Sequence, residues 1–152
     1  MSDPMTIAST LDVAGLAVDL IRIPSFSHTP RQEEQVGEYI AAYFEKIGIE
    51  VNRQQVEEGR FNILAKIPGN GGPSIMLNGH IDTVPPYDMA DPFSCTIENG
   101  RILGRGACDM KGPVAAMMTA MAAIKLSGVT PAGDIYFSAV VDEEEKGLGV
   151  EA

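Results

Sequence analysis

Residues 112–141 read GPVAAMMTAMAAIKLSGVTPAGDIYFSAVV, which joins a helical pattern to an apolar strand that follows it. Apolar side chains recur at intervals of three and four over residues 112–126, as they do on one face of a helix. Residues 134–141 form a short, mostly apolar run that is typical of a buried strand. The predicted buried face of the helix consists of Val114, Met117, Met118, Met121 and Ala122. A helix that leads into a buried strand predicts an α/β fold.

The residues before this stretch continue the alternation of helices and strands. Apolar periodicity predicts helices over residues 10–23 and 29–47. Thr29 and Gln32 form a capping box at the start of the second helix, and Pro30 suits its first turn. Predicted strands cover residues 49–54, 61–67 and 74–78, and the last of these is expected to be a buried parallel strand.

A long loop is expected between residues 83 and 107. It contains a short predicted hairpin over residues 96–103, which turns at Asn99-Gly100. The alternation along the whole chain predicts a mostly parallel sheet flanked by helices. Ligands of such sheets bind beyond the carboxyl ends of the strands, so the polar residues that follow the strands are the first candidates for a functional site.

The composition is that of a globular protein with an acidic surface. Its 152 residues include 21 acidic and 11 basic side chains, which gives a formal net charge of −10. This charge argues against nucleic acid or an anionic membrane surface as a partner. No apolar run reaches the ~18 residues of a membrane-spanning helix, and residues 1–9 lack the basic start of a signal peptide. Two cysteines do not make a disulfide framework, so a cytoplasmic location is expected.

Three polar segments stand at the ends of predicted elements. Residues 79–86, GHIDTVPP, follow one strand, and residues 142–145, DEEE, follow another. Residues 104–112, GRGACDMKG, come directly before the helix of residues 112–126. The carboxyl ends of neighbouring strands and a helix start are where an α/β protein builds a site.

The first segment holds an imidazole and a carboxylate two residues apart. In extended backbone His80 and Asp82 point to the same side. A carboxylate in this place can accept one imidazole N–H and leave the other ring nitrogen for a metal ion. The alternative is a loop histidine that pairs with Asp82 for structural reasons alone.

The segment of residues 142–145, DEEE, places four carboxylates in succession. Close packing of like charges is costly unless a cation or solvent compensates it. One interpretation is a solvated acidic turn. The other is a site where one carboxylate holds a divalent cation and its neighbour acts as a general base.

The segment of residues 104–112, GRGACDMKG, offers Asp109 and Cys108. An acidic residue at a helix start is favourable without any ligand, and adjacent residues rarely bind one metal well. Cys108 and Cys95 are therefore expected to be packing residues, and His28 a loop residue.

Together the three segments resemble the N-terminal motifs of the M20 metallopeptidase family. The order and spacing of GHIDTVPP, GRGACDMKG and VVDEEEKGLG agree with that family, and the opening IPSFS at residues 23–27 is similar to its N-terminal stretch. The resemblance covers essentially the whole chain. It implies hydrolysis of an amide bond in an N-acyl amino acid or a short peptide, at a site with two zinc ions, where cobalt or manganese can substitute.

The resemblance also implies a role for individual residues. His80 would bind one metal ion and Asp82 would orient that histidine. Asp109 would bridge the two ions, next to an unusual cis peptide bond that joins it to the following methionine. Glu144 would bind the second ion, and Glu143 would be the general base.

Two departures from the family pattern follow from the sequence. Lys146 stands where a glycine is common, so a register with Glu144 as the base and Glu145 as the ligand stays open. The chain is also shorter than family members, and a later acidic ligand, a last histidine ligand and an inserted lid domain that dimerises are not in its sequence. Residues 1–152 are therefore expected to be the N-terminal part of a catalytic domain, inactive alone, from a protein that is a homodimer at full length.

Two other function classes are weighed against the hydrolase. A non-catalytic α/β module, which binds a metal ion or regulates the enzyme, would use the same acidic residues without turnover. A serine hydrolase is disfavoured because the sequence has no Gly-x-Ser-x-Gly elbow and Ser138 lies in the middle of a predicted strand.

Overall fold

The computed structural model describes residues 2–29 and 31–152. Its helices are α1 (Pro4–Ala8), α2 (Val13–Arg22), α3 (Glu34–Lys46), α4 (Gly112–Ser127) and α5 (Leu148–Glu151). Its strands are β1 (Glu50–Glu57), β2 (Arg60–Ile67), β3 (Gly72–His80), β4 (Thr96–Glu98), β5 (Arg101–Leu103) and β6 (Gly133–Val140). An irregular turn, η1 (Ala107–Lys111), leads directly into α4.

The main sheet has four strands in the order β1-β2-β6-β3. β3 and β6 run parallel, whereas β1 with β2 and β2 with β6 pair antiparallel. The predicted α/β class is confirmed, but the expectation of a mostly parallel sheet is wrong for the part of the chain that is described. β1 and β2 are joined by the tight turn Glu58-Gly59, and so short a connection permits only antiparallel pairing.

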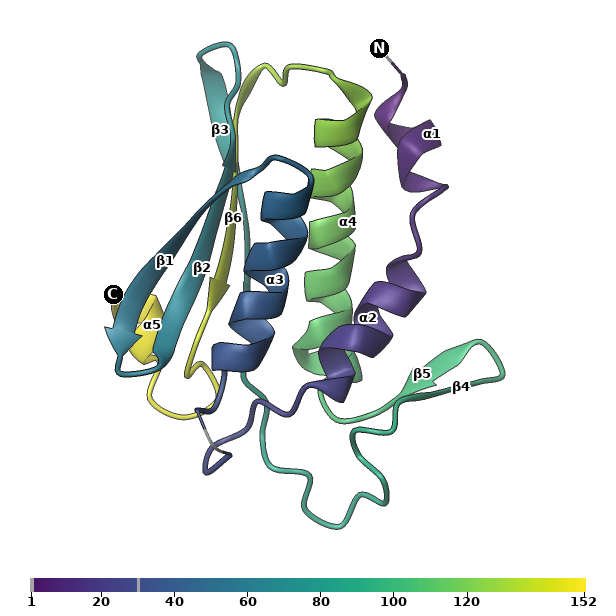
Figure 1. Ribbon diagram of the computed structural model, residues 1–152, viewed down its shortest axis with the longest axis vertical. Coiled ribbons are helices and arrows are strands. Elements are labelled where there is room, and N and C mark those ends of the chain that lie inside the picture. The colour runs from purple at the N-terminus through teal and green to yellow at the C-terminus, as the bar shows by residue number, and fades with distance from the viewer. Residues whose placement is uncertain (1, 30) are drawn as a thin grey trace.

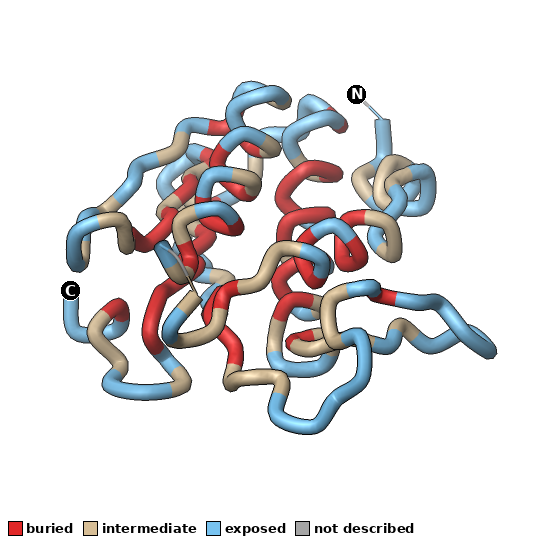
Figure 2. Tube along the Cα trace, turned by 60° about the horizontal axis from the view of Figure 1, so that its bottom comes forward, coloured by how far each residue is buried: buried red, intermediate tan, exposed pale blue. Residues whose placement is uncertain are grey.

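The core lies between one face of this sheet and the helices α3 and α4 (Figure 1). Phe44 of α3 packs edge-on against Phe137 of β6, with ring centroids 4.9 Å apart. Buried residues concentrate along these helices and the strands beneath them (Figure 2). The predicted buried face of α4 is confirmed at Val114, Met118, Met121 and Ala122, and Met117 is half-buried. The stretch of residues 112–141 therefore supplies two of the elements that enclose the core, α4 and β6.

The first predicted helix is shorter than expected. α2 begins at Val13 because the Asp12 carboxylate accepts a hydrogen bond from the Gly15 N–H at 2.8 Å and caps the helix there. The separate helix α1 was not predicted, and the Asp3 carboxylate caps it through the Thr6 N–H at 3.1 Å.

The second predicted helix also begins later, at Glu34. Thr29 does not cap it, because its hydroxyl donates to the Phe26 carbonyl at 2.6 Å and closes the preceding turn. Gln32 has a φ of 40°, which is incompatible with a helical residue. Pro30 lies outside the described residues.

β3 differs from its prediction in burial. It is parallel to β6, as expected, but it is an outer strand of the described sheet and most of its residues are exposed. Ile75 and Met76 keep 56% and 58% of their accessible surface. The hairpin of β4 and β5 is confirmed, with positive φ at both Asn99 and Gly100. Among the described residues, no helix combines the length and the apolar character that a membrane crossing requires.

Candidate metal centre

The parallel pairing of β3 and β6 brings two of the polar segments to one edge of the sheet. His80, the last residue of β3, is the register partner of Val140, the last residue of β6. Residues 81–86 and 142–145 therefore leave the sheet side by side.

The turn η1 reaches the same edge through a close contact with β3. The His80 N–H donates to the sulfur of Met110 at 3.3 Å. A Cβ atom at Gly79 would lie 2.8 Å from the methyl carbons of Met110 and Met117, so a larger residue there would require these two flexible side chains to shift. The peptide bond between Asp109 and Met110 is cis, as the family resemblance implied.

His80 is buried and its two ring nitrogens have different neighbours. Nδ1 lies 3.1 Å from the Asp82 carbonyl oxygen and 3.3 Å from Asp82 Oδ1. Nε2 lies 3.0 Å from Asp109 Oδ1 and 3.7 Å from Glu143 Oε2. A proton on Nδ1 that is held by Asp82 leaves Nε2 as the nitrogen that faces the acidic residues, which is the arrangement of a metal-binding histidine.

Asp82 is buried and contacts two of the predicted ligands. Besides its contact with His80, its Oδ2 accepts a hydrogen bond from the backbone N–H of Glu144 at 2.9 Å. The sequence predicted the first of these contacts and not the second. Asp82 therefore fixes the segment that carries Glu144 as well as the imidazole of His80.

The three residues predicted to bind metal come together. His80, Asp109 and Glu144 can each offer a ligand atom, and these atoms lie within 4.8 Å of one another. One imidazole and two carboxylates are donors that zinc accepts. The side chain of Asp109 keeps 74% of its accessible surface and that of Glu143 keeps 50%, so the group is open on one side. The residues that are present fit a divalent cation.

The electrostatics of the group also favour a cation. Burial raises the pKa of Glu144, and the charge of Asp109 raises it further. Burial lowers the pKa of His80, but hydrogen bonds to Asp82 and Asp109 outweigh burial and raise that pKa to about 9. The acidic residues around His80 therefore favour a positive charge at this position.

Lys111 is a functional candidate that the sequence reasoning missed. It is fully buried, and its Nζ donates to the Ile23 carbonyl at 2.6 Å. Burial lowers its pKa to about 7, against an opposing effect of the Asp82 charge. The available signal in the sequence was its position two residues after Asp109, a predicted metal ligand. A lysine is normally exposed or paired with an acidic residue, so a fully buried lysine at this position is unusual.

Lys111 belongs to a contact that ties the segment of residues 23–26 to the site. The Ser25 hydroxyl donates to the Ile81 carbonyl at 2.7 Å, and the Thr83 N–H donates to the Ser25 carbonyl at 3.2 Å. The residues of the IPSFS stretch therefore run beside the segment that carries Asp82 and hold it in place.

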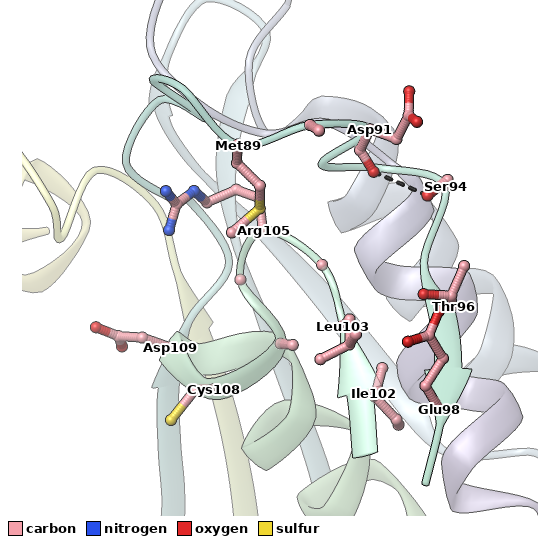
Figure 3. A pocket seen from close by; sticks show the side chains of 14 residues that line it. Met89, Asp91, Ser94, Thr96, Glu98, Ile102, Leu103, Arg105, Cys108 and Asp109 are labelled. Atoms are coloured by element: carbon pink, nitrogen blue, oxygen red, sulfur yellow. Dashed lines mark hydrogen bonds between the residues drawn. The ribbon is translucent and has the colours of Figure 1, made fainter. Parts of the chain in front are cut away.

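Other residues that the sequence singled out lie apart from the group. Glu145 is exposed and does not belong to it, which supports the register with Glu143 as base and Glu144 as ligand. Cys108 is exposed, so the expectation that it is a buried packing residue is wrong. Figure 3 shows its thiol and the Asp109 carboxylate pointing in different directions. Cys95 is buried, as expected of a packing residue.

These features define an α/β protein with a candidate divalent-metal centre at the carboxyl edge of its sheet. The family model of peptidase family M20/M25/M40 matches residues 76–152, a range that includes all three polar segments. The chain belongs to this family.

Individual relatives agree with this assignment. The succinyl-diaminopimelate desuccinylase of Gluconacetobacter diazotrophicus is 39% identical over 150 residues, which cover 95% of this chain and 38% of that protein. The di-peptidase Dug1p from Saccharomyces cerevisiae has a similar structure, with a TM-score of 0.81 and 17% identity over 97% of this chain and 36% of that one. The chain spans little more than a third of the length of these relatives.

A third relative is the YXEP protein of Bacillus subtilis, described as a dinuclear metal binding peptidase from the M20 family. Its TM-score is 0.62 at 19% identity, over 92% of this chain and 37% of that one. Structural likeness at such identities shows the shared fold.

Proposed function

We propose that the chain supplies the metal-binding edge of a metal-dependent amide hydrolase. The observation that carries this proposal is the convergence of His80, Asp109 and Glu144, whose ligand atoms lie within 4.8 Å of one another. Membership of a peptidase family supports the same reaction class.

The proposed site holds two zinc ions. His80 and Glu144 would each bind one ion, and Asp109, which has two carboxylate oxygens and lies 3.0 Å from His80, would bridge them. The description of the Bacillus subtilis relative as a dinuclear metal binding peptidase supports this number. A set of imidazole and carboxylate donors also accommodates cobalt or manganese.

Glu143 is the proposed general base. When bound, a divalent cation supplies Lewis acidity toward water and toward the scissile carbonyl group. Glu143 reaches the site without belonging to the ligand group, since its Oε2 lies 3.7 Å from His80 Nε2 and its side chain is half exposed. Its carboxylate would take a proton from the attacking water and pass that proton to the leaving amine nitrogen.

The proposed substrate is an N-acyl amino acid or a short peptide. A relative named as a desuccinylase and a structural neighbour named as a di-peptidase support this class. We further propose that residues 1–152 are the N-terminal part of a catalytic domain and that the complete protein is a homodimer.

Zinc titration by calorimetry tests the proposal on this chain. Wild-type protein should bind zinc, and Asp109→Ala should abolish binding because it removes the carboxylate shared by both ions. Glu144→Gln should weaken binding strongly, whereas Glu143→Gln should retain it within about threefold, because a base beside the metal is not a ligand. Glu145→Gln is the matched control in the same acidic run.

Two outcomes would contradict the proposal. Zinc binding that Asp109→Ala leaves unchanged would place the metal elsewhere. Loss of zinc in Glu145→Gln with retention in Glu144→Gln would establish the alternative register.

A further inference from the structure

The loop of residues 142–148, which we call the acidic loop, is closed by a single side chain from β2. Asn62 Oδ1 accepts a hydrogen bond from the Val141 N–H at 3.0 Å, and Asn62 Nδ2 donates to the Gly149 carbonyl at 2.7 Å. The Gly149 N–H also donates to the Val141 carbonyl at 3.2 Å. The two ends of the acidic loop, which carries the proposed base and one proposed metal ligand, therefore meet at Asn62.

Asn62 lies where the pairing of β2 with β6 stops. The last register pair of the two strands joins Ile63 to Ala139, and the Asn62 amide holds the chain that continues beyond it. Ile63 is fully buried in the core, so Asn62, the adjacent residue of the strand, faces the other side of the sheet. The helix α5, which contains Gly149, lies next to β1 and β2 (Figure 1).

The closure depends on the residue types at both positions. The Val141 N–H needs an acceptor and the Gly149 carbonyl needs a donor, and a side-chain amide supplies one of each. Asn62 is 2% exposed, and its Nδ2 also donates to Gln54 Oε1 at 3.0 Å. A Cβ atom at Gly149 would lie 2.4 Å from the Val141 carbonyl oxygen, so the two ends approach this closely only with glycine.

Two further contacts hold the acidic loop between its ends. Asp142 accepts a hydrogen bond from Arg60 at 2.7 Å, and the Glu144 N–H donates to Asp82 Oδ2 at 2.9 Å. Asp142 has a φ of 63°, and a residue other than glycine keeps such a conformation only when its surroundings hold it. The place of Glu144 in the candidate metal centre thus depends on residues that are not ligands.

We propose that Asn62 is a positioning residue of the metal centre, because it fixes the acidic loop so that Glu144 reaches His80 and Asp109. This inference rests on the proposed function, since it assigns Asn62 a role at a site that binds zinc. An open loop has to be ordered when the metal binds, and the free-energy cost of ordering weakens binding. The closed loop removes most of this cost before the metal arrives.

The test is amide hydrogen exchange of the metal-free chain, followed residue by residue by nuclear magnetic resonance. Asn62→Asp keeps the shape of the side chain but places a carboxylate oxygen against the Gly149 carbonyl, so it should open the acidic loop. The Glu144 N–H should then exchange at least about tenfold faster than in the wild type, because local opening breaks its hydrogen bond to Asp82.

Ile67→Val is the matched control, since Ile67 is a buried residue at the opposite end of β2. It weakens the sheet through a lost core contact and touches neither end of the acidic loop. The Glu144 exchange rate should stay within about twofold of the wild-type rate, because distant sites act independently. An equal acceleration in Ile67→Val and Asn62→Asp would indicate a general loss of stability and overturn the inference.

Gly149→Ala opens the same closure from its other side and leaves Asn62 unchanged. Among the described residues, α5 contributes none to the hydrophobic core, so this variant disturbs the acidic loop and not the core. The Glu144 N–H should again exchange at least about tenfold faster. This variant decides the outcome if Asn62→Asp fails to fold.

Zinc calorimetry connects the acidic loop to the metal centre. Asn62→Asp and Gly149→Ala should each bind zinc about 10–100-fold more weakly than the wild type, as is typical when a residue that orients metal ligands is changed. The added negative charge of Asn62→Asp favours zinc by itself, so weaker binding by this variant cannot be an effect of charge.

The inference is overturned if either folded variant has the wild-type exchange rate at Glu144, or if either binds zinc as tightly as the wild type. A wild-type chain that binds no zinc would contradict the proposed function. Faster exchange at Glu144 in the two variants would in that case still show that Asn62 holds the acidic loop in place.

Discussion

Two acidic clusters meet at the same edge of the sheet and differ in what neutralises them. In the first, the Arg60 guanidinium lies 2.6 Å from Glu33 and 2.7 Å from Asp142, and both carboxylates are buried. In the second, Asp109 and Glu144 face His80. The first cluster contains its own permanent cation, whereas the second contains an imidazole that can exchange its proton for a metal ion.

Neighbouring residues of one acidic run are divided between the clusters. Burial opposes ionisation of Asp142, but its hydrogen bond to Arg60 outweighs burial and lowers its pKa. Two residues later, burial and the Asp109 charge raise the pKa of Glu144. Because both side chains are at least partly buried, the difference comes from the charge that each one faces. Within one acidic run, Asp142 therefore forms a structural ion pair, whereas Glu144 is a candidate metal ligand.

The largest predicted effect comes from removing the internal cation of the first cluster. Arg60→Met should lower the free energy of unfolding by about 3–5 kcal/mol, because it leaves two buried carboxylates without a partner. Urea denaturation followed by circular dichroism measures this change.

Arg53→Met is the control, since Arg53 also contacts two carboxylates, Glu38 and Glu45, but at an exposed position. It should cost about 1 kcal/mol or less. Equal losses for the two variants would mean that the buried cluster contributes no more than an exposed one.

The second prediction concerns the effect of zinc on the second cluster. Free zinc at 100 times its Kd should raise the free energy of unfolding by about 2.7 kcal/mol, provided that only the folded chain binds it. A chelator should reverse the gain, and Asp109→Ala should show none. Denaturation with and without zinc measures the difference, and a gain that persists in Asp109→Ala would place the zinc outside this cluster.

The third prediction concerns the residue that positions the second cluster. Asp82→Asn should reduce zinc affinity about 10–100-fold, as is typical when a hydrogen-bonding partner of a metal-binding histidine is changed. Calorimetry measures the affinity, and Glu145→Gln is again the control. Unchanged affinity in Asp82→Asn would show that the buried carboxylate does not organise the ligands.

The smallest effect is expected at Asp134, a half-buried acidic residue far from both clusters. The Gly69 N–H and the Lys66 ammonium, 2.8 Å and 2.6 Å away, lower the pKa of Asp134 to about 2. Lys66→Gln should raise that pKa while leaving it below its usual value of 3.8, because the backbone hydrogen bond remains. A carbon-detected pH titration measures it.

The sign of the associated stability change follows from the lowered pKa. The folded chain binds the Asp134 proton less readily than the unfolded chain, so this contribution is present above pH 3.8 and is lost as the pH falls toward 2. In Lys66→Gln the loss should begin at the same pH and be smaller. An acid transition that is identical in the two proteins would contradict this assignment.

Sequence periodicity predicted the elements better than their partners. The pattern of apolar residues located α4 and β6, because the spacing of side chains that share one face is fixed by the local backbone geometry of a helix or a strand. The antiparallel pairing of β2 with β6 depends on contacts between residues such as Ile63 and Ala139, 76 positions apart, which no local pattern records.

The candidate site was predictable to a similar extent. The family motifs identified all five candidate residues, and the structure places each of them at one edge of the sheet. The separation of Asp142 from the other acidic residues was not predicted, because Arg60 comes from a strand 82 residues upstream. Lys111 was missed because its burial arises from the packing of residues 23–26 and not from its neighbours in sequence.

The exposed outer strand β3 has a consequence for how the chain behaves in concentrated solution. Apolar side chains on a strand at the border of a sheet make that border a template for pairing with another molecule. The net charge of −10 opposes such contacts, because like-charged molecules repel each other. Physiological salt shortens the range of this repulsion to about 8 Å. Colloidal stability of the purified chain is therefore expected to depend on low ionic strength.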